Sequence, residues 1–65
     1  MTEQQIIKAI SKVEGIGGMT VNERLWVSGL WDEFDKCLKS DKEKAKRILE
    51  LLKVDLPSIE LIVKD

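Results

Sequence analysis

The sequence predicts an all-α fold, a small bundle of three to four short helices in one domain over residues 1–65. Apolar residues recur at helical spacing, capping residues precede three of the segments, and glycine or proline separates most segments. The chain has 65 residues, one Cys and no His. These counts exclude an internal disulfide and the usual zinc ligand sets, which leaves helix packing, oligomerisation or a partner to stabilise the fold.

The first helix is expected over residues 4–14. Thr2 and Gln5 stand at the spacing of a capping box, in which two side chains satisfy free backbone N–H groups. The apolar stripe of this helix comprises Ile6, Ile10 and Val13. Residues 15–18 contain three glycines and are interpreted as a turn. Phosphate binding is the alternative for this loop, but no strand precedes it and no Lys follows it.

The strongest helical pattern runs from Val21 to about Leu38, and we expect this helix to be the centre of the bundle. Thr20 and Glu23 form its capping box. Its first half is apolar on two faces and its second half on one, as in a helix buried on two sides. One arc comprises Val27, Leu30, Trp31, Phe34 and Leu38, with Val21 and Leu25 nearly opposite. Gly29 within this helix is expected to let another backbone approach closely.

Two further helices complete the predicted bundle. One is expected over residues 41–53, with Ser40 and Glu43 as its capping box. Its apolar stripe comprises Ala45, Ile48, Leu49 and Leu52. The other follows Asp55, and Pro57 suits its first turn. A helix is preferred there because a lone strand would have nothing to pair with.

Groups suited to catalysis are scarce, and we predict no enzymatic activity, no cofactor and no metal. Without His, the chain has no Ser–His or Cys–His pair. Cys37 lies near a helix C-terminus, where the dipole raises the pKa of a thiol, and is interpreted as a small buried residue. Asp32 and Asp35 share a helix side, where a solvated face is preferred over a cation site.

The aromatic residues indicate a binding surface. Trp31 and Phe34 lie in the middle of the apolar stripe and are expected in the core. Trp26 lies at the edge of the stripe, where either the margin of the core or an interface accounts for it. The predicted partner-binding edge comprises Trp26, Leu30, Glu33 and Cys37.

A second function remains open because residues 36–47 contain six basic side chains. In this alternative the helices 21–38 and 41–53 act as a helix-turn-helix on nucleic acid. The predicted contacts are Lys42, Lys44, Lys46 and Arg47. A solvated helix face is the simpler interpretation, since the formal net charge is −1 and acidic residues precede the basic ones.

The stretch Met-Thr-Val-Asn-Glu-Arg-Leu over residues 19–25 is distinctive. Together with Gly29-Leu30 and the Asp-Glu-Phe-Asp of residues 32–35, it resembles a group of short bacterial proteins with no assigned activity. The resemblance implies a small bacterial helical protein and transfers no functional residue. From the residues themselves, Asn22 and Arg24 are expected to hydrogen-bond the glycine loop, with a small anion or partner site as the alternative.

The sequence therefore predicts a protein-interaction module. It is expected to form a homodimer or to inhibit a larger protein in the manner of an immunity protein or antitoxin. The chain is expected to be cytoplasmic, because no apolar run approaches the ~18 residues of a membrane span and the first residues lack the features of a signal peptide.

Overall fold

The first helix begins where its capping box predicts. The structure is a computed structural model that describes residues 1–64, and in it α1 spans Glu3–Ser11. The Thr2 hydroxyl accepts a hydrogen bond from the Gln5 N–H, and the Gln5 side chain accepts one from the Thr2 N–H. The helix ends at Ser11, before the predicted Glu14. A 3₁₀ turn, η1 (Ile16–Gly18), leads on to the second helix.

The prediction of one helix over residues 21–38 is wrong. The chain forms α2 (Val21–Ser28) and α3 (Trp31–Ser40), which are separated at Gly29. Gly29 takes the left-handed conformation with φ 74°. Its N–H donates to the Trp26 carbonyl, and the Leu30 N–H donates to the Leu25 carbonyl. These two bonds make a Schellman motif, a regular way to end a helix.

The break at Gly29 lets Leu25 and Leu30 enter the same core. On an uninterrupted helix, residues five positions apart point about 140° away from each other. In the structure both side chains are buried. The two apolar faces in the sequence therefore belong to two helices that meet the core at different angles.

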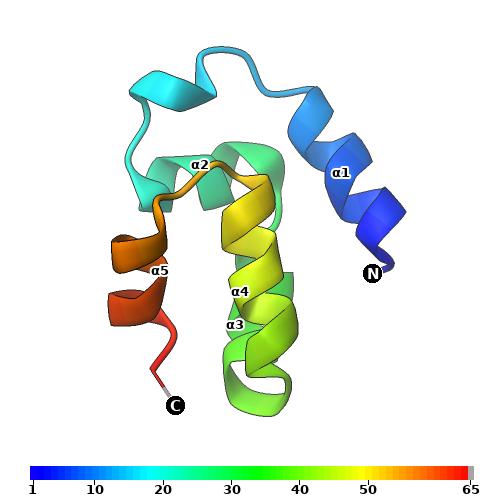
Figure 1. Cartoon of the computed structure of the whole chain (residues 1–65). Helices are drawn as coiled ribbons and strands as arrows, with labels where there is room; N and C mark the ends of the chain where they lie inside the picture. The colour runs from blue at the N-terminus through cyan, green and yellow to red at the C-terminus, as the bar shows by residue number, and fades with distance from the viewer. Residues whose placement is uncertain (65) are drawn as a thin grey trace.

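The last two helices are close to their predictions. α4 spans Lys42–Leu51 and α5 spans Leu56–Ile62. The predicted capping box of Ser40 with Glu43 is wrong, because the Asp41 carboxylate accepts the Lys44 N–H while the Ser40 hydroxyl donates to the Lys36 carbonyl. Asp55 caps α5 by accepting the Ser58 N–H. A helix in this region is thus confirmed within the described residues (Figure 1).

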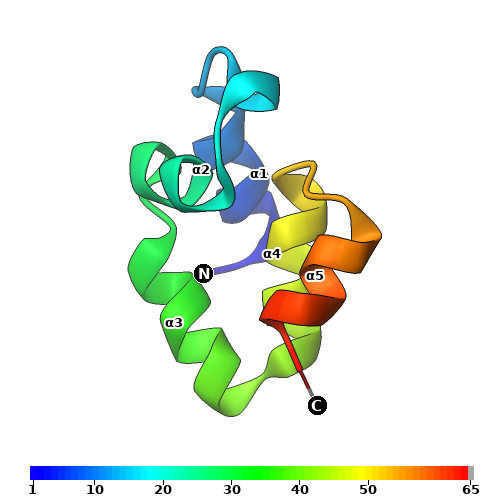
Figure 2. The ribbon, with the colours of Figure 1, turned by 90° about the vertical axis from the view of Figure 1, so that its left-hand side faces the viewer.

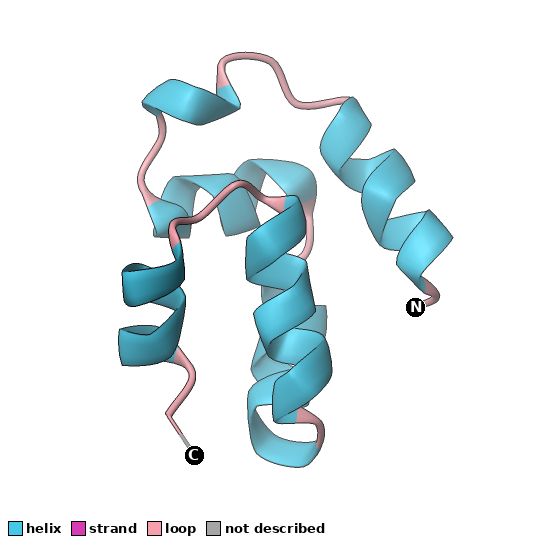
Figure 3. Cartoon of the chain, viewed as in Figure 1, coloured by secondary structure: helices cyan, strands magenta, loops and turns pink. Residues whose placement is uncertain are grey.

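α4 is the central helix, in place of the predicted helix 21–38. It contacts α1, α3 and α5, and α3 and α4 form an antiparallel pair joined by a tight turn (Figure 1, Figure 2). α2 runs across one end of this pair, and helices and loops make up the whole described chain (Figure 3). The buried core comprises Ile6, Leu25, Leu30, Phe34, Cys37, Ala45, Ile48, Leu49, Leu52, Val54, Ile59 and Val63.

Phe34 lies in this core as expected, but the prediction that Trp31 is a core residue is wrong. The first turn of α3 directs Trp31 outward, and the residue is 40% exposed. Among residues 1–64, no helix is long and apolar enough to cross a membrane.

Candidate functional site

The predicted partner-binding edge of Trp26, Leu30, Glu33 and Cys37 does not form a single exposed surface. Trp26 is 75% exposed, whereas Leu30 and Cys37 are 0% and 4% exposed. The Glu33 side chain is largely covered by its ion pairs. These four residues would share one edge only on a continuous helix. The break at Gly29 removes that alignment and leaves only Trp26 fully on the outside.

The structure brings Trp26 and Trp31 together instead. Their ring centroids lie 6.0 Å apart with an interplanar angle of 50°, a tilted arrangement common for aromatic pairs. Val27 beside Trp26 is 55% exposed. We call Trp26, Val27 and Trp31 the tryptophan surface. It exists because the left-handed Gly29 turns the chain so that the end of α2 and the start of α3 lie at one corner.

The sequence contained a signal for this pairing. A glycine between two tryptophans five positions apart suits a helix end, where side chains on both sides of the turn can meet. The interpretation of Gly29 as a site of close backbone approach hid that signal. A Cβ built on Gly29 would meet no atom within 4 Å, so close packing is not the reason for this glycine.

Acidic residues predominate in the helical segments that carry the tryptophan surface. Glu23 in α2 and Asp32 and Asp35 in α3 are all exposed. Asp35 is paired with Lys39 at 3.2 Å. Arg24, the only basic residue between positions 21 and 35, points away from this surface and binds other parts of the chain. The exposed charged residues between positions 21 and 35 are therefore all acidic.

Arg24 holds three segments of the backbone together. Its Nε donates to the Met19 carbonyl at 3.0 Å. Its Nη1 donates to the carbonyls of Leu52 and Lys53 at 3.1 and 3.0 Å. Arg24 thus bonds Met19, the residue directly after the glycine loop, and not the loop residues 15–18 themselves, and the same guanidinium also caps the C-terminus of α4. This pattern explains Arg24 without an anion.

Glu33 and Cys37 belong to a polar cluster between α3 and α4. The Lys44 ammonium lies 3.2 Å from the Glu33 carboxylate and, with the N-terminal amine, holds the pKa of Glu33 below its usual range. Burial raises the pKa of the Cys37 thiol, and the Glu33 charge raises it further. The thiol Sγ lies 3.9 Å from the Glu33 carboxylate. A thiol held in its protonated form is a poor nucleophile.

All four basic side chains predicted as nucleic-acid contacts interact with other groups within the chain. Lys44 bonds Glu33 and the Met1 carbonyl, and Arg47 bonds Glu3 at 2.5 Å. Lys42 donates to the Lys64 carbonyl. Lys46 is engaged as well. These bonds fasten α1 and the end of the chain to α4.

The remaining candidates are a loop and a carboxylate pair. The glycine-rich residues 15–18 form η1, which starts from Gly15 with φ 71°. Asp32 and Asp35 lie on the surface of α3. Within residues 1–64, no group of three or more His, Cys, Asp or Glu side chains is placed to hold a metal ion.

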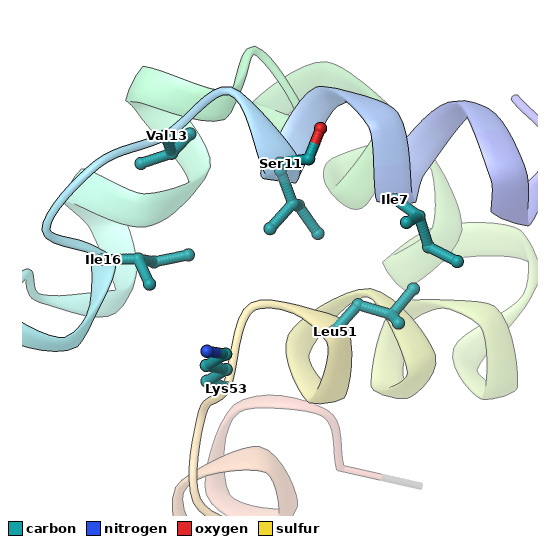
Figure 4. Close-up of a pocket in the computed structure, with 7 residues that line it drawn as sticks. Ile7, Ser11, Val13, Ile16, Leu51 and Lys53 are labelled. Atoms are coloured by element: carbon teal, nitrogen blue, oxygen red, sulfur yellow. The ribbon is translucent and has the colours of Figure 1, made fainter.

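An apolar groove lies between α1, η1 and the end of α4 (Figure 4). Its volume is about 280 Å³, close to the lower limit for small-molecule sites. It shares no residue with the tryptophan surface. Its lining residues are Ile7, Ile10, Ser11, Val13, Ile16, Leu51 and Lys53.

Comparison of the chain with protein-family models, with curated proteins and with solved structures finds no match.

Proposed function

We propose that this chain is a cytoplasmic protein-interaction module that binds its partner through the tryptophan surface. The observation that supports the proposal is the exposure of Trp26 and Trp31 side by side. Exposed indole rings lose contact with water when a partner covers them, and Trp is the residue most typical of interface hot spots. A monomer would gain little stability from holding two tryptophans in this position.

The charges around the surface favour a basic partner. Glu23 and Asp32 are exposed carboxylates on the two helices that carry the indole rings, three positions before Trp26 and one position after Trp31. Lys or Arg side chains of a partner would meet these carboxylates and could also lie over an indole face, a cation–π contact. A symmetric homodimer would set this surface against its own copy and bring like charges together. We therefore favour a different protein over a second copy, in the manner of an inhibitor that covers a basic site.

No observation favours the nucleic-acid alternative. Lys44 and Arg47, which would contact phosphates, are bonded to Glu33 and Glu3. Releasing them would loosen the attachment of α1.

The first experiment uses a defined probe. A helical peptide of Leu and Lys is titrated against the labelled protein and followed by NMR, beside an isomer in which Glu replaces Lys. The Lys peptide should shift the amide signals of residues 21–35 and bind more weakly as salt rises. Equal binding of the Glu peptide would contradict the proposed partner chemistry.

The second experiment uses variants with a matched control. Trp26→Ala and Trp31→Ala should each weaken binding of the Lys peptide and of a partner purified from the source cell, by about 30-fold for a hot-spot residue. Leu61→Ala removes a side chain that is 70% exposed on α5 and should leave both unchanged. Sedimentation of the isolated chain should give a monomer. If the chain is a dimer and Trp26→Ala converts it to a monomer, the partner of the tryptophan surface is a second copy of the chain.

A further inference from the structure

The groove between α1, η1 and the end of α4 has the composition of a binding site for an alkyl chain. Five aliphatic side chains form its walls, and Ser11 and Lys53 are its only polar lining residues (Figure 4). The aliphatic lining comprises Ile7, Ile10, Val13, Ile16 and Leu51. No carboxylate lines the groove. An apolar chain with one polar end fits such walls better than a ligand with several hydrogen-bonding groups.

Lys53 at the edge of this groove has an unusual backbone conformation. Its φ is 64°, and it is the single non-glycine residue with positive φ within residues 1–64. It closes a Schellman motif in which the Lys53 N–H donates to the Glu50 carbonyl and the Val54 N–H to the Leu49 carbonyl. The left-handed conformation is strained for a residue with a side chain.

The same motif at the end of α2 shows what this position ordinarily contains. There the left-handed residue is Gly29, and the two hydrogen bonds have the same spacing. The chain therefore uses glycine at one of two equivalent positions and a strained lysine at the other. Strain at a single residue is a reason to look for a use of its side chain. The difference in surroundings is that Lys53 lines the apolar groove.

We infer that the groove binds a free medium-chain alkyl carboxylate, with the alkyl chain along the aliphatic walls and the carboxylate at the Lys53 ammonium. No ion pair with the Lys53 ammonium is present in the described part of the chain. An anionic head group would therefore give the Lys53 ammonium an opposite charge at the edge of the groove. This inference goes beyond the proposed function, since the tryptophan surface and the groove have no residue in common.

The test is a titration of the whole chain with hexanoate, octanoate and decanoate, kept below the concentrations at which they form micelles. NMR amide signals of residues 7–16 and 51–53 should shift in a saturable way. Each added methylene should tighten binding about fourfold until the groove is full. Decanol and decyltrimethylammonium are the matched controls for the head group, and both should bind more weakly than decanoate.

Two variants separate the charge from the backbone conformation. Lys53→Gly removes the ammonium and relieves the strain, so it should weaken binding of decanoate by about fivefold while the melting temperature stays the same or rises. Lys53→Gln removes the charge and keeps the strain, and should weaken binding to the same degree. Binding of decanol should be unchanged in both, because it does not use the charge.

Three results would overturn the inference. They are the absence of saturable shifts with any of the carboxylates, binding of decyltrimethylammonium as tight as that of decanoate, and full affinity for decanoate in both Lys53 variants. Trp26→Ala should bind decanoate normally. The two proposals can therefore fail independently.

Discussion

Gly29 and Lys53 occupy the same position in two copies of one helix-ending motif. Both have positive φ, 74° and 64°. At Gly29 a side chain would meet no neighbour, so only the backbone conformation requires glycine. At Lys53 the side chain is tolerated at a cost. Substitutions at these two residues should therefore change stability in opposite directions.

We expect Gly29→Ala to lower the free energy of unfolding by about 1 kcal/mol, the net cost of a left-handed alanine. Lys53→Gly should raise it by up to about 1 kcal/mol. Gly17→Ala is the control, because Gly17 has no positive φ and open space around it. Urea unfolding followed by far-ultraviolet circular dichroism measures all three. A destabilising Lys53→Gly would show that the lysine side chain stabilises the fold.

Cys37 should make stability depend on pH in the alkaline range. Burial raises the pKa of its thiol in the folded chain. As pH rises, the unfolded chain loses the thiol proton first, so the free energy of unfolding falls above the ordinary thiol pKa of ~8.5. Cys37→Ala lacks this contribution. The stability difference between wild type and Cys37→Ala should therefore shrink between pH 8 and pH 10 in urea titrations. A constant difference would mean that the native thiol titrates normally.

At the scale of elements, α1 is the most weakly attached helix. Ile6 is its one fully buried side chain. Ala9 and Ile10 are only partly buried against the core, and the ion pair of Glu3 with Arg47 that joins α1 to α4 is exposed. Exposed ion pairs contribute little, typically 0.2–1 kcal/mol. Helices with few buried contacts open at low free energy, so α1 should open separately from the rest of the fold.

Hydrogen exchange followed by NMR tests this expectation. Amides of α1 should exchange faster than those of α4, and Ile6→Ala should remove the remaining protection of α1 while α4 keeps its own. Arg47→Ala should reduce the protection of α1 only slightly. Equal protection of α1 and α4 in wild type would contradict local opening and indicate one cooperative unit.

At the scale of the whole molecule, stability depends on α4. Ala45, Ile48, Leu49 and Leu52 are completely buried, and α4 contacts α1, α3 and α5. A domain of this size has a net stability of only about 3–10 kcal/mol. It has no disulfide to compensate for a lost contact, since Cys37 is free. Truncation of one large buried side chain of α4 should therefore be enough to unfold the chain.

Leu49→Ala should cost about 2–5 kcal/mol and leave a large unfolded fraction at 37 °C. Leu61→Ala removes the same side chain from an exposed position and should change stability by less than about 0.5 kcal/mol. Thermal unfolding by circular dichroism compares the two. A cooperative transition of Leu49→Ala close to that of wild type would show that the core can close around the lost side chain.

The sequence by itself determined the all-α class and most of the helix starts. Thr2, Thr20 and Asp55 cap helices through bonds to residues three positions ahead, and such local geometry is fully encoded in neighbouring residues. It also indicated that Arg24 hydrogen-bonds backbone near the glycine loop, and its partner there is Met19, the next residue. Local signals were ambiguous at Ser40 and Asp41, two adjacent cap residues of which only Asp41 is used.

Only the tertiary structure decided which surface is exposed. Gly29 is compatible with a helix interior and with a helix end, and the choice depends on where the core lies, since the break lets both Leu25 and Leu30 be buried. That choice turned Trp31 outward beside Trp26. The pairs of Lys44 with Glu33 and of Arg47 with Glu3 join residues far apart in the chain. No spacing rule predicts them, because their geometry exists only after the helices have packed.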